Sequence, residues 1–211
     1  MKNKPQYIVV AGINGAGKST LFTIYPDLFA HTQRINADEI LRDFKGDWHN
    51  NSDNLKAMRI ELHRLHEAIK QRRSIHFETT LAGSGKAQAN LIEEAHHQGF
   101  EVTLLYVTLD SSEKAIQRVN ARVANGGHGV EPDLIKKRYV QSLQNLTKIA
   151  SKADTVSIFD NSENGDGLNL IYSRNGHRVE INLLKEFPWI EIGVPVSHNR
   201  SISSKLKHHE R

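Results

Sequence analysis

An α/β fold is predicted for this chain of 211 residues, with an open, mainly parallel sheet and helices on both of its faces. Two observations predict it. Short apolar runs rich in β-branched residues alternate along the chain with longer amphipathic segments, which is the order of strands and crossover helices in such folds. The first run, QYIVVAG, is apolar at successive positions, as in a strand buried on both faces of a parallel sheet.

The first half of the chain continues this alternation. KSTLFTIY is a helix that Pro26 ends, TQRINA is a second short strand, and residues 52–72 form an amphipathic helix. SIHFETTL is the third strand, and KAQANLIEEAHHQ is a helix that Gly99 ends. The core face of the 52–72 helix is predicted from apolar residues at helical spacing, namely Met58, Leu62, Leu65 and Ile69.

The second half begins with the strong strand FEVTLLYVTL. A helix then runs to about residue 124, with Asp110 and Glu113 as its predicted capping box. The segment NGGHGVEP separates it from a helix at 133–150. VSIFD is a further strand, and LNLIYSRNGHRVEI is a hairpin that turns at Asn175-Gly176.

The length predicts a single domain at 1–196, followed by a basic, flexible tail at 197–211. The tail holds most of the formal net charge of +4, because Arg200, Lys205, Lys207 and Arg211 outweigh Glu210. The remaining body is close to neutral, so a nucleic-acid partner is not favoured.

No cysteine is present, which excludes disulfides and thiolate metal sites and suits a reducing cytoplasm. The N-terminal MKNKPQ leads directly into a strand and has no apolar h-region, and no later stretch is long enough to cross a membrane. The histidines form no zinc-type pattern. We therefore expect a cytoplasmic protein with no membrane partner and no structural metal.

A complete GxxxxGK[ST] motif follows the first strand and precedes the first helix, as this phosphate-binding loop requires. Its glycines permit positive φ and let backbone amides surround a polyphosphate, while Lys18 reaches the β and γ phosphates and Ser19 binds Mg²⁺. The motif predicts a P-loop NTPase that binds ATP or GTP with Mg²⁺. The predicted nucleotide-binding residues here are Gly12, Asn14, Gly15, Ala16, Gly17, Lys18, Ser19 and Thr20. A second glycine stretch, 83–86, fails the spacing and is interpreted as a loop that enters a helix.

Among P-loop proteins, a nucleotide-kinase-like arrangement fits best, because the chain has neither an NKxD segment nor an LSGGQ signature. Small kinases close a lid whose arginines neutralise the transferring group. A small helical lid is predicted at about 118–138, with Arg118 and Arg122 on one helix face and glycines around His128 as a hinge. The alternative is that both arginines only solvate the outside of that helix.

Three further polar residues lie within or directly after predicted strands, near the edge where ligands bind in open α/β sheets. Asp38 can accept a proton from an attacking hydroxyl or contact Mg²⁺, and its alternative role is to cap the next helix. Glu78 lies within an apolar strand and needs a partner or a ligand. Asn161 can contact adenine or can cap a turn.

Four segments in this order, GINGAGKST, NADEI, FETTL and RVNARVANGGHGVEPDLIKKRYVQSLQNL, resemble the zeta-toxin family of P-loop kinases, close to its branch labelled predicted ABC-type ATPase. The resemblance covers residues 6 to 180. It implies ATP-dependent phosphorylation of a hydroxyl group, which in characterised toxins is the 3′-hydroxyl of the amino sugar of UDP-N-acetylglucosamine. It also implies an antitoxin protein as a partner.

The resemblance assigns the loop lysine to Lys18, the general base to Asp38 and the substrate-contacting glutamate to Glu78, which Thr79 and Thr80 follow. The first lid arginine corresponds to Arg122, with Arg118 as a neighbour that can substitute. Toxin members carry another lid arginine before a Thr-Pro, whereas this chain has GGHGVEP, so His128, Lys137 or Arg138 would replace it. The sequence therefore predicts an ATP·Mg²⁺-dependent small-molecule kinase. Two alternatives are a polynucleotide-end kinase and a non-catalytic ATP-binding switch.

Overall fold

The computed structural model describes residues 4–163 and 167–191, so the predicted tail at 197–211 lies outside the described residues. The strands are β1 (Gln6–Ala11), β2 (Gln33–Ile35), β3 (Ile75–Thr79), β4 (Glu101–Thr108), β5 (Thr155–Asp160), β6 (Asn169–Asn175) and β7 (Arg178–Asn182). The α-helices are α1 (Lys18–Ile24), α2 (Ala37–Asp43), α3 (Asn51–Lys70), α4 (Lys86–His97), α5 (Ser112–Ala124), α6 (Pro132–Ala150) and α7 (Pro188–Glu191).

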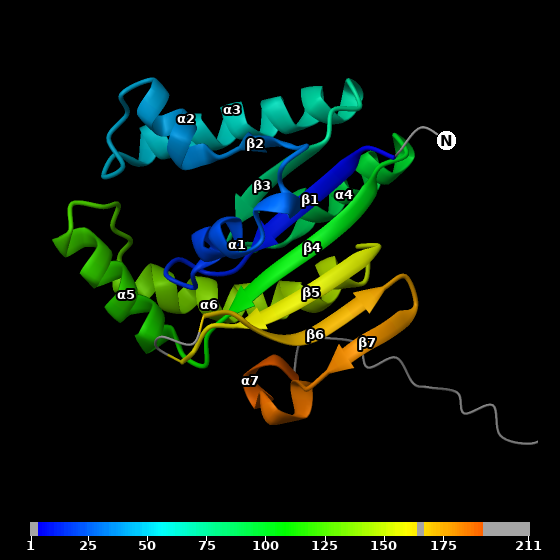
Figure 1. The fold of residues 1–211 in the computed structure, drawn as a ribbon. Helices are drawn as coiled ribbons and strands as arrows, with labels where there is room; N and C mark the ends of the chain where they lie inside the picture. The colour runs from blue at the N-terminus through cyan, green and yellow to red at the C-terminus, as the bar shows by residue number, and fades with distance from the viewer. Residues whose placement is uncertain (1–3, 164–166, 192–211) are drawn as a thin grey trace, which may run out of the picture.

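These strands form one sheet in the order β2-β3-β1-β4-β5-β6-β7 (Figure 1). The pairs from β2 to β5 are parallel, and β6 and β7 add an antiparallel edge. The predicted α/β fold with a mainly parallel sheet is therefore confirmed. The predicted hairpin is also present, and Gly176 in its turn has a φ of +54°.

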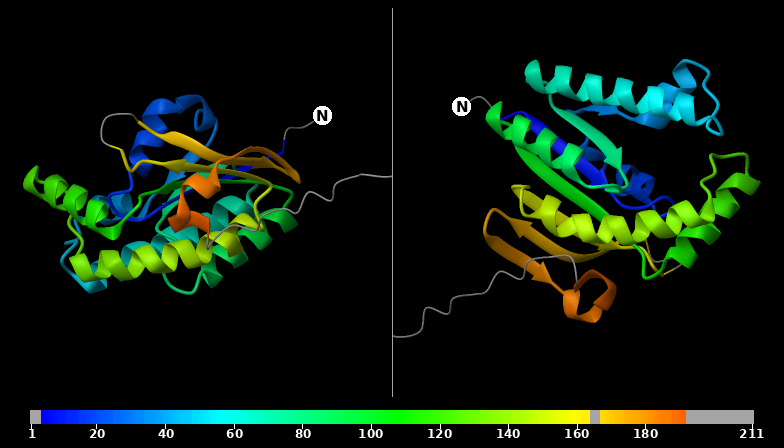
Figure 2. Two further views of the ribbon diagram at one scale, coloured as in Figure 1. Left: turned by 90° about the horizontal axis from the view of Figure 1, so that it is seen from below. Right: turned by 180° about the vertical axis from the view of Figure 1, so that it is seen from behind.

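Helices cover both faces of the sheet (Figure 2). Alternate residues of β1 belong to different cores: Tyr7 and Val9 face the side covered by α3, α4 and α6, whereas Ile8 and Val10 face the side covered by α1 and α5. All four are buried, which explains why the strand carries no charged side chain and its one strongly polar residue is the half-buried Gln6 at its start.

The strand order directs the site to one edge of the sheet. β1 lies between β3 and β4, and the chain crosses from one side of β1 to the other after β3. The loops that follow β1, β2 and β3 therefore meet at the carboxyl edge of the sheet, beside this switch in direction. Ligands of open α/β sheets bind in such a crevice.

The predicted core face of α3 is wrong in its first half. Leu65 and Ile69 are buried, but Met58 is 58% exposed and Leu62 is 39% exposed. The reason is that the first half of α3 packs on α2 through a separate small cluster that includes Ala57, and only its second half reaches the sheet. Helical periodicity located the apolar residues but not the elements against which they pack.

The predicted capping box of α5 is also wrong. Ser111, not Asp110, is the N-cap, and its hydroxyl accepts a hydrogen bond from the Lys114 amide at 3.4 Å. Asp110 instead pairs with the Lys114 ammonium one helical turn away.

None of the helices in the described part of the chain has both the length and the apolar character that a membrane span needs.

Candidate active site

The loop between β1 and α1 is a compact turn that only glycine permits at several positions. Gly12, Gly15 and Gly17 have φ values of +138°, +81° and +97°. A β-carbon would also collide with the Val107 carbonyl oxygen at Gly12 and with the Asn161 side chain at Gly17. The motif's glycines are therefore required both for backbone conformation and for close approach. The second glycine stretch is a loop that enters α4, as predicted, with Gly85 as the N-cap.

The side chain of Lys18 folds back onto the loop that precedes it. Its ammonium donates hydrogen bonds to the carbonyl oxygens of Gly12 at 2.8 Å and of Ile13 at 3.3 Å. The amine is thus held over the loop that the sequence assigns to phosphates. Burial lowers the pKa of Lys18 from its ordinary value.

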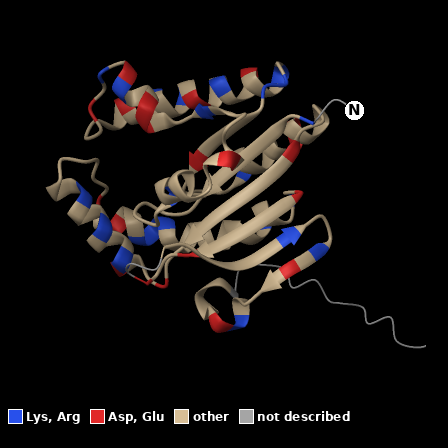
Figure 3. Cartoon of the chain, viewed as in Figure 1, with Lys and Arg blue, Asp and Glu red and all other residues tan. Residues whose placement is uncertain are grey.

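The charges that act on Lys18 identify which predicted residues converge. The carboxylates of Glu78 and Asp38 raise its pKa, and the cations of Arg122 and Arg138 lower it. These four residues come from β3, α2, α5 and α6. Figure 3 shows the same division, with acidic residues on α2 and basic residues along α5 and the start of α6. Two acids and two arginines are therefore close enough to Lys18, at the carboxyl edge of the sheet, for their charges to shift its pKa.

Asp38 is exposed in the first turn of α2 and does not cap the helix. The N-cap is Asn36, whose side-chain oxygen accepts the Glu39 amide at 3.1 Å. The capping alternative for Asp38 is therefore wrong. Its carboxylate also raises the pKa of Arg138, whereas burial lowers that pKa. Asp38 thus belongs to the same electrostatic cluster as Lys18.

Glu78 has the cationic partner that its position requires. Its side chain is 16% exposed, and one carboxylate oxygen accepts hydrogen bonds from Arg34 at 2.6 Å and from Asn36 at 3.0 Å. Arg34 also pairs with Glu39 at 2.8 Å. Sequence reasoning missed Arg34, although a half-buried acid and a basic residue on a neighbouring parallel strand were a usable signal.

The lid region lies between α5 and α6. Arg122 donates from its Nε to the carbonyl oxygen of His128 at 2.8 Å, which fixes the connecting loop to the end of α5. Arg118, one turn earlier, is half-buried. The ring of His128 lies 5.4 Å from the ring of Trp48, in the connection between α2 and α3. Two connections far apart in sequence therefore meet beside the crevice.

Arg138 makes the most direct contact between α6 and the phosphate loop. Its guanidinium donates to the side-chain oxygen of Asn14 at 2.8 Å. Among the three residues predicted as substitutes for the second lid arginine, Arg138 is the one that touches the loop, whereas Lys137 is exposed. The contact joins residues 124 positions apart, which no local pattern indicates.

Four predicted hydroxyl residues occupy two different settings. Thr79 ends β3 and Thr80 follows it, and their hydroxyl oxygens accept hydrogen bonds from the amides of Leu81 at 3.2 Å and Ala82 at 3.4 Å. Ser19 and Thr20 begin α1, with Ser19 exposed and Thr20 half-buried. No group of three acidic or histidine side chains in the described ranges could hold a metal alone. A hydroxyl that shares a cation with phosphate oxygens fits this setting.

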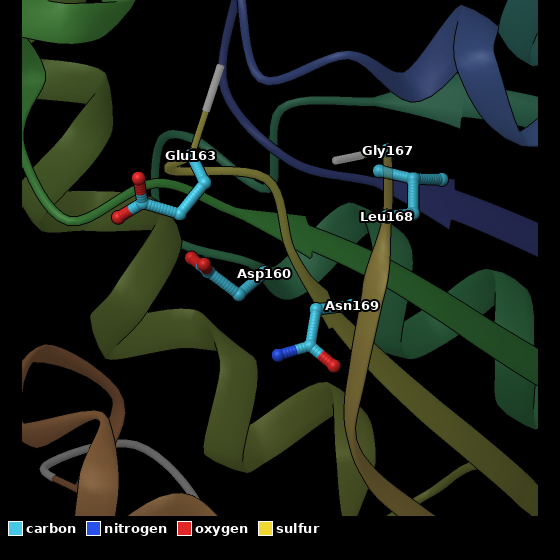
Figure 4. Close-up of a pocket in the computed structure, with 5 residues that line it drawn as sticks. All are labelled: Asp160, Glu163, Gly167, Leu168 and Asn169. Atoms are coloured by element: carbon cyan, nitrogen blue, oxygen red, sulfur yellow. The ribbon is translucent and has the colours of Figure 1, made fainter. Parts of the chain in front are cut away.

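The side chain of Asn161 contacts the phosphate loop. Its side-chain amide donates to the carbonyl oxygen of Ala16 at 2.8 Å and so supports the phosphate loop from β5. A cavity of about 390 Å³ opens next to it (Figure 4). The lining residues are Asp160, Glu163, Gly167, Leu168 and Asn169. The carboxylates of Asp160 and Glu163 disfavour a phosphate group in this cavity and suit an uncharged hydrogen-bond donor.

Replacement of Asn161 with alanine is expected to lower the free energy of unfolding by about 1–3 kcal/mol, because the Ala16 carbonyl would lose its partner inside the fold. Urea unfolding of the two proteins measures this difference. Asn169→Ala, at the exposed cavity wall, is the matched control and is expected to change stability by less than about 0.5 kcal/mol. Equal free energies of unfolding for wild type and Asn161→Ala would contradict the view that the hydrogen bond from Asn161 to the Ala16 carbonyl stabilises the phosphate loop.

Comparisons with known proteins agree with the fold and with the phosphate-loop motif. Residues 1–177 match the family described as Zeta toxin. An uncharacterised protein of Haemophilus influenzae is 34% identical over 139 residues, which are 66% of this chain and 94% of that protein.

Two solved structures share the fold at low identity. A chain of the AvrRxo1-ORF1:-ORF2 structure with ATP superimposes with a TM-score of 0.73 at 15% identity, over 97% of this chain and 67% of its own length. A chain of the PezAT toxin-antitoxin system of Streptococcus pneumoniae has a TM-score of 0.53 at 17% identity, over 82% and 72%. The prediction of a phosphotransferase with a P-loop kinase fold is confirmed at the level of the family. The chain belongs to the Zeta toxin family.

Proposed function

We propose that this protein transfers the γ-phosphoryl group of ATP to a hydroxyl group of a small molecule. The observation that carries the proposal is the convergence of Asp38, Glu78, Arg122 and Arg138 on Lys18 beside a glycine loop. Phosphoryl transfer needs cations around the phosphates and a carboxylate next to the attacking hydroxyl. The two arginines, the lysine and the two acids at one edge of the sheet support both requirements.

The phosphate loop and its lysine would hold the polyphosphate. Positive φ at Gly15 and Gly17 supports a loop whose amides surround an anion. Lys18 would exchange its two carbonyl partners for phosphate oxygens, while Ser19 would bind Mg²⁺. When bound, Mg²⁺ neutralises charge on the β and γ phosphates.

Asp38 is the proposed general base, because it is exposed at the crevice and belongs to the cluster around Lys18. Glu78 would contact or orient the acceptor beside it. Two carboxylates at one edge suit an acceptor that presents several hydroxyl groups, since each carboxylate oxygen can accept a hydrogen bond. A sugar nucleotide has this chemistry, and UDP-N-acetylglucosamine, implied by the family resemblance, is the first candidate.

Residues 118–138 would act as the lid. Arg122 would steady the transferred group, with Arg118 as a neighbour, and Arg138 would replace the second lid arginine of toxin members. The hydrogen bond between Arg138 and Asn14 supports this replacement, because it keeps a guanidinium at the phosphate loop. Contact between Trp48 and His128 supports closure of the lid over the acceptor side.

A protein partner is proposed from the relatives. The PezAT structure is described as a toxin-antitoxin system. An antitoxin encoded with this protein would be the corresponding partner, and co-purification of the two chains would test it.

The test of the proposed function is a search for the acceptor. The protein is incubated with Mg²⁺ and γ-labelled ATP, in parallel with a metabolite extract, a panel of sugar nucleotides and a single-stranded oligonucleotide. We expect labelled product, with the mass of one added phosphoryl group, from a small hydroxylated acceptor. Label on the oligonucleotide alone would favour a polynucleotide-end kinase. Tight ATP binding without transfer in any arm would favour a switch protein.

A further inference from the structure

Glu61, in the middle of α3, is a half-buried acid whose side chain reaches the start of α2. One of its carboxylate oxygens accepts a hydrogen bond from the backbone amide of Ala37 at 3.0 Å. Ala37 is the first residue of α2 and directly precedes Asp38. A helix start leaves such amides without partners inside the helix, so a side chain from elsewhere that binds one fixes the position of the turn.

The other side of the same turn is held from the sheet. The side chain of Asn36 accepts the Glu39 amide and donates to Glu78 at 3.0 Å. The first turn of α2 is therefore held by an acid from α3 on one side and by an acid from β3 on the other. Asp38 lies between these two attachments.

We propose that Glu61 is a positioning residue for Asp38, which acts by holding the amide of Ala37 and thereby fixing the carboxylate at the crevice. This inference rests on the proposed function, in which Asp38 is the base. Glu61 acts through the backbone of α2 and supplies no group to the reaction.

The surroundings of Glu61 make this contact sensitive to pH near neutrality. Burial raises the pKa of Glu61 to about 7, the Ala37 amide opposes this rise, and the negative charges of Asp38 and Glu78 add to it. Burial, and after it the charges of Glu94 and Glu61, raise the pKa of Tyr7 of β1, so Tyr7 is neutral in this range. Arg34 of β2 reduces the influence of Glu78 by pairing with it.

Ionised Glu61 holds the amide by a charge-assisted hydrogen bond, which is roughly twice as strong as a neutral one. The hydrogen bond from the Ala37 amide to Glu61 is therefore stronger above pH 7 and weaker below it. We expect kcat to rise by about tenfold as pH increases through 7, with little change in KM for ATP, because the loop that binds phosphates is not involved.

Three variants separate this role from a general effect on folding. Glu61→Gln retains an acceptor for Ala37 but cannot ionise, so the rise in kcat near pH 7 should disappear while ATP affinity stays unchanged. Glu61→Ala removes the acceptor and should lower kcat at every pH. Glu67→Gln, on the same helix, changes a carboxylate that accepts from the neighbouring Gln71 and should retain the wild-type pH profile.

A second readout needs no turnover. The NMR shift of the Ala37 amide, followed with pH in the full chain, should titrate with a midpoint near 7 in the wild type and should not titrate there in Glu61→Gln. In Asp38→Asn the titration should persist with a lower midpoint, because one of the charges that raise it is gone.

The two proposals fail separately in these experiments. An Ala37 amide that does not titrate near 7 in the wild type, or that still does so in Glu61→Gln, would overturn the positioning role even if phosphate is transferred. A titrating amide in a protein that phosphorylates no acceptor would support the contact and overturn the proposed function.

Discussion

Replacement of Lys18 with alanine is expected to lower phosphoryl transfer by about 10²–10³-fold and to weaken ATP binding as well. The reason is that the ammonium, held by two carbonyl oxygens of its own loop, would meet the phosphates in both the ground state and the transition state. An interaction made in both states affects binding and transfer together. Calorimetric titration with ATP and initial rates with saturating acceptor measure the two effects.

The chain supplies a matched control for this variant. Lys86 also follows a glycine of positive φ and begins a helix, but it is exposed and belongs to the second glycine stretch. Lys86→Ala should leave both ATP affinity and the transfer rate within twofold of the wild type, which is about 0.4 kcal/mol. If Lys18→Ala bound ATP as tightly as Lys86→Ala, the assignment of the loop to phosphate binding would be wrong.

Replacement of Asp38 with asparagine is expected to lower kcat by about 10²–10⁴-fold, the usual contribution of a general base. ATP binding should be retained, because Asp38 lies across the crevice in α2 and the phosphate loop is unchanged. The exchange preserves the size of the side chain, and the N-cap of α2 is Asn36, so the helix should remain folded. Single-turnover transfer rates together with ATP affinity test this expectation.

Asp43→Asn, at the exposed end of the same helix, is the control for a general effect of lost negative charge. It should behave as wild type. If Asp38→Asn transferred phosphate at the wild-type rate, Asp38 would not be the general base. Glu78, the other acid that acts on Lys18, would then be the next candidate.

Much of the fold could be predicted from the sequence because its signals are local. The run of buried apolar residues from Tyr7 to Ala11 in β1 indicated a central parallel strand, and the glycines, which have positive φ in the structure, marked the phosphate loop and the hairpin turn. The face of α3 could not be predicted, since Met58 and Leu65 have similar helical phase but different neighbours. Which apolar residues are buried depends on where the helix leaves the sheet.

Part of the candidate site could also be predicted from the sequence. Lys18 and Asp38 come after β1 and β2, and Glu78 lies near the end of β3. The rule that ligands bind at the carboxyl edge brings the three together without coordinates. Arg34, Glu61 and Arg138 could not be assigned in this way. Each acts through a contact with a residue at least 24 positions away, and many other charged residues of the sequence occupy similar helix or strand positions.

The sequence by itself determined the alternation of strands and helices, the phosphate loop and the acids near the carboxyl ends of the strands, because backbone preference and short-range patterning encode them. The tertiary structure alone decided that Glu61 and Glu78 hold the start of α2, that Asn161 supports the loop and that Arg138 reaches Asn14. These contacts depend on the packing of helices across the sheet, and the energy of a charge is set by the neighbours that packing brings to it.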